Sequence, residues 1–300
     1  MRVLLSTIGS RGDVQPLLAL ALELRALGHE PRVCAPPDFH SLIDGHGLPF
    51  VPLGPGVRST AKSVRPAPPG EPSPEAMRRV VAATVAGQFE TVGAAAKDCD
   101  VIVGGGALQI ATRSIAELRG VRYVFAAYCP ITLPSAHHAP PPLSMRGETP
   151  ADESAAGRAA DYGALWDQEA RHWNDTFGPA LNEQRAAAGL DPVHDVRSHI
   201  FTDRPLLAAD PELGPWQKTG DREPTPPDLE PTPADLDVLQ TGAWILRDRR
   251  PLPSELETFL DAGKPPIYFG FGSMRATQET GRATIEAARA LGYRAIVARG

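Results

Sequence analysis

The stretch Arg2-Val3-Leu4-Leu5-Ser6-Thr7-Ile8-Gly9-Ser10-Arg11-Gly12-Asp13 decides the fold of this chain. Its first six residues form a largely apolar run, which is typical of a buried strand, and two glycines follow. Beyond them, apolar residues recur at helical spacing, and a glycine stands where a helix C-terminal cap belongs: Val14, Leu17, Leu18, Ala21, Leu24 and then Gly28. The stretch predicts a strand, a tight turn and a helix. Strands are expected again at residues 31–35 and 48–53, and this order is typical of an α/β fold with a parallel sheet.

The turn between this strand and helix lies where ligands bind in open α/β sheets, at the carboxyl end of a strand. Ser10 and Asp13 are expected to face that crevice. The turn is not a Gly-x-Gly-x-x-Gly fingerprint, because it has two glycines and a carboxylate that a pyrophosphate would repel. Two interpretations of Asp13 stay open, a cap of the helix N-terminus and a group with a chemical role.

Five motifs appear along the chain in one order. They are Gly-Ser-Arg-Gly-Asp-Val-Gln-Pro-Leu-Leu-Ala-Leu at 9–20, Pro-Pro-Asp at 36–38, Thr-Asp at 202–203 with Ala-Ala-Asp-Pro at 208–211, Gln-Thr-Gly-Ala-Trp at 240–244 and Phe-Gly-Phe-Gly-Ser at 269–273. Together they resemble the actinobacterial antibiotic glycosyltransferases of family 1, the group with the vancomycin-type glycopeptide and angucycline enzymes. The resemblance implies a GT-B fold with Rossmann-like domains and an inverting transfer of a (deoxy)sugar.

The resemblance also implies roles for residues in two turns. Asp13 matches the favoured general base, and the positions that match donor-binding residues are Ser10, Arg11, Gly12, Gly272 and Ser273. A helix cap is an equally weighted interpretation of Ser273. The donor is expected to be a dTDP- or UDP-sugar, and the acceptor a small aglycone such as an aromatic polyketide or glycopeptide. No further cofactor is expected, and no metal, because no DxD-like carboxylate pair is placed to hold a cation over the diphosphate.

Candidate acceptor-binding residues lie in a loop and in the helical stretch that follows it. The proline-rich loop from residue 129 to 150 carries His137 and His138, which titrate near neutrality, although exposed loop histidines are usually solvated. In the next helical stretch, Trp166 and Trp173 are candidates for lining a pocket for a flat or apolar aglycone. The alternative is that both indoles belong to the core, which is commoner for aromatic residues at helical spacing.

The composition excludes several classes of partner. The net charge is −6 with acids and bases interspersed, so no basic face for nucleic acid or an anionic membrane is expected. Three cysteines without a Cys-x-x-Cys pair indicate neither a disulfide framework nor a zinc site. No signal peptide and no apolar run of a spanning helix is recognised, so the sequence predicts a cytoplasmic location. It does not predict an oligomeric state.

The chain is expected to divide into three parts. Residues 1–213 are predicted to form an acceptor-binding Rossmann-like domain whose last strand lies at 205–209, residues 214–252 a proline-rich insertion and linker, and residues 253–300 the start of a nucleotide-sugar-binding domain. In the resembling enzymes this second domain continues for on the order of 100 residues, with a His-His-Gly-Gly-type loop for the donor diphosphate. We favour a fragment of a longer gene product over a truncated relative or a partner-binding remnant.

Two other functions remain in view. A sterol or lipid glucosyltransferase is the runner-up among enzymes, because those proteins carry a similar first turn. A truncated, non-catalytic module that binds a natural product or a partner protein is the alternative outside enzymes.

Overall fold

The fold is that of a computed structural model, which describes residues 1–56, 73–141, 162–217, 236–248, 250–270, 272 and 278–298. The chain divides into two compact units, Met1–Leu246 and Arg247–Gly300. Each unit is described by itself.

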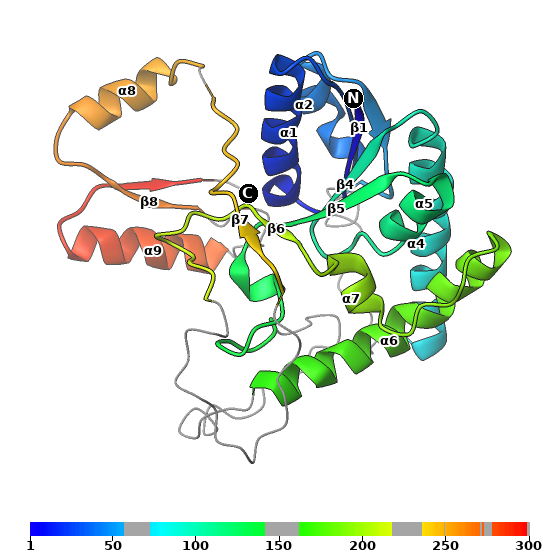
Figure 1. Cartoon of the computed structure of the whole chain (residues 1–300). Coiled ribbons are helices and arrows are strands. Elements are labelled where there is room, and N and C mark those ends of the chain that lie inside the picture. Colours follow the sequence, from blue (N-terminus) through cyan, green and yellow to red (C-terminus); the bar gives the residue numbers. More distant parts are fainter. Residues whose placement is uncertain are drawn as a thin grey trace. The chain divides into compact units, whose positions relative to one another are not determined.

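The first unit is built on a parallel sheet of seven strands in the order β3-β2-β1-β4-β5-β6-β7 (Figure 1). The strands are β1 (Arg2–Thr7), β2 (Glu30–Ala35), β3 (Phe50–Pro52), β4 (Val101–Gly105), β5 (Arg122–Ala127), β6 (Leu206–Leu207) and β7 (Leu239–Gln240). Neighbouring strands pair in parallel throughout. The order reverses beside β1, because β1 pairs with β2 on one side and with β4 on the other. Such a reversal places a crevice at the carboxyl ends of the two central strands.

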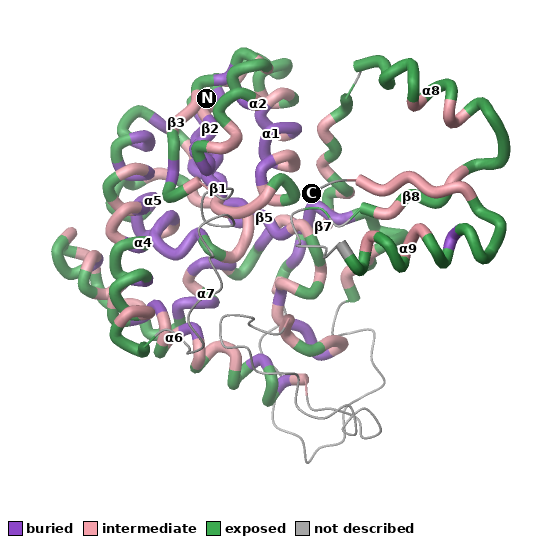
Figure 2. The backbone as a smooth tube through the Cα atoms, turned by 180° about the vertical axis from the view of Figure 1, so that it is seen from behind, coloured by how far each residue is buried: buried purple, intermediate pink, exposed green. Residues whose placement is uncertain are grey.

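Helices cover both faces of this sheet. On one face lie α1 (Arg11–Ala26) and the short α2 (His40–Asp44); on the other lie α4 (Pro74–Ala95), α5 (Thr112–Arg119), α6 (Tyr162–Ala187) and α7 (Val196–Phe201). Each face of the sheet has its own hydrophobic core, and successive residues of β1 point into different cores. Val3 and Leu5 pack under α1, whereas Leu4 packs under α4 and α5. Figure 2 shows β1 and the inward stripe of α1 buried. Burial on both faces explains why these strands are continuously apolar.

The N-terminus of α4 follows directly from its sequence. The Ser73 hydroxyl accepts a hydrogen bond from the Ala76 N–H at 3.2 Å, and Pro74 occupies the first helical position, where its missing N–H has no cost.

The end of the first unit differs from the sequence-based expectation. We predicted the last strand at 205–209 and placed residues 214–252 in a linker, but β7 lies within that range and extends the sheet beyond β6. Gln240 of β7 also donates to the carbonyls of Ala209 and Gly214, both at 3.0 Å, and accepts from the Trp216 N–H at 3.0 Å. A two-residue strand carries too little periodicity to be recognised from sequence.

The second unit contains α8 (Ser254–Asp261), β8 (Ile267–Phe269), α9 (Gln278–Ala290) and β9 (Ala295–Val297). The two strands pair in parallel, from Ile267 opposite Ala295 to Phe269 opposite Val297. Ala288 is the only buried hydrophobic residue among the described residues of this unit. Over the described part of the whole chain, no helix combines the length and apolarity that crossing a bilayer requires.

Candidate functional site

The turn after β1 holds the carboxylate that the sequence singled out. Asp13 Oδ2 accepts hydrogen bonds from the Ser10 N–H at 2.7 Å and the Ser10 hydroxyl at 3.3 Å, and the N–H groups of Asp13 and Val14 donate to the Ser10 carbonyl. Ser10 is the N-cap of α1 and Asp13 its third residue, so the two form a capping box. One oxygen of Asp13 therefore caps the N-terminus of α1, which agrees with the capping interpretation of this residue.

The second oxygen of Asp13 is differently placed. Among the described residues, Oδ1 receives no hydrogen bond, and it faces Gly106, where an added Cβ would lie 3.4 Å away. Gly106 has φ +78°, and a Cβ on Gly9, which has φ +148°, would overlap the Asp13 carboxylate. Glycines before α1 and after β4 therefore make the space in which this carboxylate sits.

Three strand ends meet at this edge of the sheet. The register pairs Thr7 with Gly105 and Gly105 with Ala126, and the Thr7 hydroxyl donates to the Gly105 carbonyl at 3.1 Å. The turn before α1, the glycine turn after β4 and the loop after β5 consequently lie side by side. Asp13 stands where the order of the strands reverses.

The environment of Asp13 changes its acidity. Burial raises the pKa of the Asp13 carboxyl above its ordinary value, and the Ser10 N–H, the Ser10 hydroxyl and its own backbone N–H oppose the rise. A carboxylate with a raised pKa is a stronger base than one in water. Among the described residues, this geometry supplies a half-buried carboxylate with one oxygen fixed by Ser10 and one that accepts no hydrogen bond.

Comparison with known proteins identifies the family. Residues 3–129 match the domain family described as glycosyltransferase family 28 N-terminal domain. Over its whole length the chain is 47% identical to glycosyltransferase GtfE of Amycolatopsis orientalis, of which it covers 68%, and 42% identical to the vancomycin aglycone glucosyltransferase of the same organism, of which it covers 67%. The chain belongs to these glycosyltransferases. It is similar to the antibiotic group that the motifs indicated, and it spans about two thirds of these relatives' length.

Solved structures give the fold of this glycosyltransferase. The glycotransferase of kitacinnamycin matches with a TM-score of 0.60 at 16% identity, over 100% of this chain and 65% of that one. Spinosyn forosaminyltransferase SpnP matches with a TM-score of 0.56 at 17% identity, over 100% of this chain and 66% of that one. The predicted GT-B fold is confirmed.

The other predicted donor-binding residues lie in two places. Arg11 and Gly12 are exposed in the first turn of α1, beside Ser10 and Asp13. Gly272 belongs to the second unit, where it is exposed with φ +56°, and Ser273 lies outside the described residues. The structure thus brings Ser10, Arg11 and Gly12 into one turn with Asp13.

The two loop histidines are held by the protein itself. The His138 carbonyl accepts from the Trp166 indole N–H at 2.8 Å, and the His138 ring meets the rings of Trp166 and Trp216 edge-on. Burial lowers the pKa of His138, which keeps its ring neutral at physiological pH. The Nε2 atoms of His137 and His138 are buried, with no hydrogen-bond partner among the described residues. Contact of either histidine with an acceptor stays a prediction.

The two tryptophans that were candidates for an acceptor pocket are both buried. Trp166 is 0% exposed, with the Arg197 guanidinium 5.5 Å from its ring, and Trp173 is 4% exposed between Phe177 and Phe201. Their faces are used for packing on α7 and within α6. The alternative that both indoles belong to the core is the one the structure supports.

A groove lies elsewhere, between β3 and α4. It has a volume of about 540 Å³, and its walls include Arg32, Val51, Glu90 and Ala94. None of the predicted site residues lines it.

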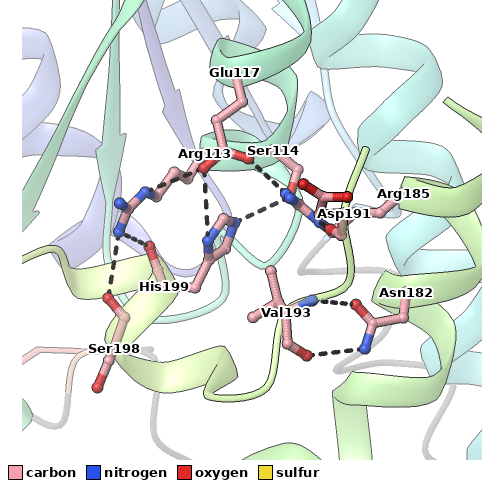
Figure 3. Close-up of polar contacts among 9 residues, drawn as sticks. All are labelled: Arg113, Ser114, Glu117, Asn182, Arg185, Asp191, Val193, Ser198 and His199. Atoms are coloured by element: carbon pink, nitrogen blue, oxygen red, sulfur yellow. Dashed lines mark hydrogen bonds and ion pairs between the residues drawn. The ribbon is translucent and has the colours of Figure 1, made fainter. Parts of the chain in front are cut away.

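A polar cluster that the sequence did not reveal joins α5, α6 and α7 (Figure 3). Arg185 is 6% exposed, and its guanidinium donates to the Ser114 hydroxyl, to Glu117 Oε2 and to the Asp191 carbonyl, each at 2.7 Å. His199 lies 3.0 Å from the Ser114 hydroxyl through Nε2 and 3.8 Å from Glu117 Oε1 through Nδ1. Its members are far apart in sequence and share no motif.

We expect His199 to make stability depend on pH. Burial lowers the pKa of His199 to about 4, an effect that Glu117 opposes and that Arg113 and Arg185 reinforce. The unfolded chain binds the proton below about pH 6.5 and the folded protein only near pH 4, so stability is full above pH 6.5 and falls as the pH drops towards 4. The loss is on the order of 3 kcal/mol. Urea denaturation at pH 7, 6 and 5 should show that the free energy of unfolding declines less in His199→Gln than in the unsubstituted protein. Equal declines would contradict the role given to His199.

Proposed function

We propose that this glycosyltransferase moves a sugar from a nucleoside diphosphate to a natural-product aglycone with inversion at the anomeric carbon, and that Asp13 is the general base. Support for the substrates comes from the names of relatives, which include the vancomycin aglycone glucosyltransferase and, at 39% identity, a dTDP-epi-vancosaminyltransferase, both of Amycolatopsis orientalis. A glycopeptide or a similar aglycone is the proposed acceptor, and a dTDP- or UDP-sugar the proposed donor.

The free oxygen of Asp13 carries the proposal for the mechanism. Oδ2 is fixed by Ser10, so the carboxylate has a defined orientation, and Oδ1 remains available to an acceptor hydroxyl at the edge where the sheet order reverses. The acceptor proton passes to Oδ1 while the acceptor oxygen bonds to the anomeric carbon. The bond from that carbon to the diphosphate breaks, and the nucleoside diphosphate leaves with the electron pair. Attack from the side opposite the leaving group inverts the configuration.

Neutral and positive groups of the two turns are proposed to hold the donor. Ser10 and Arg11 offer a hydroxyl and a charge, Gly12 and Gly272 permit close approach of backbone N–H groups to phosphate, and Ser273 is retained from the resemblance alone. SsfS6 of Streptomyces sp. SF2575, a structural relative at 17% identity, has been solved in complex with thymidine diphosphate. We propose a cytoplasmic location because the three cysteines are unpaired thiols.

A sterol glucosyltransferase is the less favoured alternative. The sterol 3-beta-glucosyltransferase of Glomerella lagenarium is 48% identical, but over 50 residues that make up 17% of this chain. The antibiotic enzymes match over the full chain.

A transfer assay tests the proposal. The protein is incubated with UDP-glucose or dTDP-glucose and with vancomycin aglycone or ergosterol, and products are identified by mass spectrometry. A glucosylated glycopeptide is the expected product. Glucosylated ergosterol would support the sterol alternative. If no glucosylated product forms and the nucleotide sugar is not consumed, the result would favour a non-catalytic module.

We expect catalysis to need no metal ion. The donor diphosphate is proposed to be neutralised by hydroxyls, backbone N–H groups and Arg11. Excess EDTA should leave the rate of transfer within about twofold of the untreated rate, a margin far below the usual contribution of a catalytic metal. Abolition of transfer by EDTA and rescue by Mg²⁺ would contradict this prediction.

A further inference from the structure

The side chain of Gln88 is a buried amide on an otherwise apolar face of α4. Gln88 is 1% exposed and stands in line with three buried valines of the same helix, Val81, Val85 and Val92. Residues at this spacing share one face of a helix, so the pattern predicts an apolar residue at 88. A buried amide is costly unless its polar atoms are hydrogen-bonded. The partners of this amide therefore explain its presence in the core.

Both polar atoms of the Gln88 amide bind the main chain of the loop between β4 and α5. Nε2 donates to the Leu108 carbonyl at 2.9 Å, and Oε1 accepts from the Ala111 N–H at 3.0 Å. Ala111 is the N-cap residue of α5, and its methyl group cannot act as a cap. In the described part of the chain, the other hydrogen bonds of residues 107–111 stay within this loop and α5. The hydrogen-bonded attachment of this loop to α4 therefore depends on one side chain.

The start of the same loop lies against Asp13. Gly106 faces the Asp13 oxygen that accepts no hydrogen bond among the described residues, since an added Cβ would lie 3.4 Å from Oδ1. The Gly106 N–H donates to the Ala126 carbonyl of β5 at 3.1 Å. Tyr128, which follows β5, lies against Gly105, where an added Cβ would overlap its hydroxyl. The point at which the loop leaves β4 is therefore fixed by β5 and the residues after it.

Gln88 fixes the other end of this turn. Its amide holds the main chain at Leu108 and Ala111, whereas the Leu108 side chain is 43% exposed and Gly106 and Ala107 are half-buried. The residues between the two fixed ends thus form an accessible surface at the edge of the sheet where Asp13 lies. A displacement of this main chain would change the space beside the Asp13 carboxylate.

We propose that Gln88 is a positioning residue for the transfer, because its amide holds the turn after β4 beside Asp13 Oδ1 and so keeps the acceptor hydroxyl in reach of that oxygen. The inference rests on the proposed function, in which Asp13 removes the acceptor proton. Gln88 is buried on α4 and acts through the main chain of residues 106–111. A misplacement of about 1 Å at the reacting atoms can cost about 10²-fold in rate, so a remote side chain can control turnover in this way.

Asn182 provides a matched control. Its Nδ2 donates to the Val193 carbonyl at 2.9 Å and its Oδ1 accepts from the Val193 N–H at 2.7 Å, so it binds main chain through the same two kinds of hydrogen bond (Figure 3). Asn182 joins α6 to the segment before α7, whereas Asp13 lies among the turns after β1, β4 and β5. Gln88→Met and Asn182→Leu each remove two hydrogen bonds and keep a side chain of similar size. Both variants should lose stability, and Gln88→Met alone should lose function.

The first measurement is steady-state transfer with the acceptor varied, expressed per folded molecule. Gln88→Met is expected to lower kcat/KM for the acceptor by about tenfold or more and to leave KM for the donor within about twofold, while Asn182→Leu leaves both unchanged. A kcat/KM for the acceptor that is unchanged in Gln88→Met, or lowered equally in both variants, would overturn the proposal.

The second measurement needs no turnover. It is a ¹³C NMR titration of the Asp13 side-chain carboxyl, whose signal is assigned by its loss in Asp13→Asn. Burial raises the pKa of Asp13, so a turn that moves away and admits water should lower this pKa in Gln88→Met and leave it unchanged in Asn182→Leu. The Ser10 N–H and hydroxyl, which oppose the rise, are touched by neither substitution. An unchanged Asp13 pKa in Gln88→Met would also contradict the proposal.

Asp13→Asn separates the failure of this proposal from the failure of the proposed function. If Asp13→Asn retains full turnover, Asp13 is not the base, and the titration alone then decides whether Gln88 holds the turn against this carboxylate. If Asp13→Asn is inactive and Gln88→Met changes neither measurement, only the role of Gln88 is wrong. Should Gln88→Met not fold, Gln88→Glu takes its place with the same expected results, because an ionised carboxylate still accepts from the Ala111 N–H but cannot donate to the Leu108 carbonyl.

Discussion

Asp13→Asn is expected to lower turnover by about 10²-fold or more, the usual effect of losing a general base. The amide has nearly the same shape and can still accept the Ser10 N–H through its carbonyl oxygen, so the capping box survives in large part. It cannot take a proton from the acceptor. The rate of transfer is measured with saturating donor and acceptor, and the free energy of unfolding by urea denaturation, where the change should stay within about 1 kcal/mol.

Asp195 offers the matched control for this variant. It is the N-cap of α7, and its carboxylate accepts from the Ser198 N–H at 3.0 Å and the Ser198 hydroxyl at 2.7 Å, much as Asp13 accepts from Ser10. Asp195→Asn should lose a little stability and no turnover. If Asp13→Asn behaves in the same way, with lower stability and intact turnover per folded molecule, then Asp13 is a helix cap and the proposed mechanism is wrong.

Arg197→Ala is expected to lower the free energy of unfolding by about 3–5 kcal/mol, because it leaves a buried carboxylate uncompensated. Arg197 and Glu169 form an ion pair at 3.0 Å, with side chains 5% and 10% exposed. The same guanidinium donates to the Trp166 carbonyl and lies over the Trp166 ring. Burial raises the pKa of Glu169, and Arg197 opposes that rise, so the lost guanidinium also favours protonation of the acid. Urea denaturation at pH 7 measures the loss.

Two variants separate charge from packing at this pair. Arg197→Met with Glu169→Leu replaces both charges by apolar groups of similar volume and should restore most of the stability. Arg204→Ala breaks an ion pair with Asp237 at 3.0 Å whose side chains are 74% and 67% exposed, and should cost under about 1 kcal/mol. Equal losses for Arg197→Ala and Arg204→Ala would show that burial of the first pair has no energetic weight.

Much of the candidate site could be predicted because it lies within one short turn. Ser10, Arg11, Gly12 and Asp13 are neighbours in sequence, so the strand, the glycines and the helix pattern place them together whatever the rest of the chain does. The capping interpretation of Asp13 could be predicted for the same reason. The position of Asp13 against Gly106 could not be predicted, since it depends on the register that pairs Thr7 with Gly105, 98 residues further along the chain.

Two differences between the structure and the sequence-based expectations share a cause. Trp166 and Trp173 stand at helical spacing, and periodicity gives the face of a helix without saying what covers it. In this protein α7 covers that face of α6, because Arg197 lies over the Trp166 ring and Phe201 lies beside Trp173. Likewise, β7 was placed in a linker because its identity as a strand comes from pairing with β6 and not from its own two residues.

By itself the sequence determined the parallel α/β architecture, the GT-B family and the presence of a carboxylate at the first strand end, because these follow from local periodicity, turn glycines and ordered motifs. Only the tertiary structure decided that one Asp13 oxygen caps the helix while the other accepts no hydrogen bond among the described residues. It also decided that Tyr128 approaches the turn after β4, and that Arg185 and Arg197 hold α6 against its neighbours. These relations join residues distant in the chain, and their energies depend on burial, which no single segment specifies.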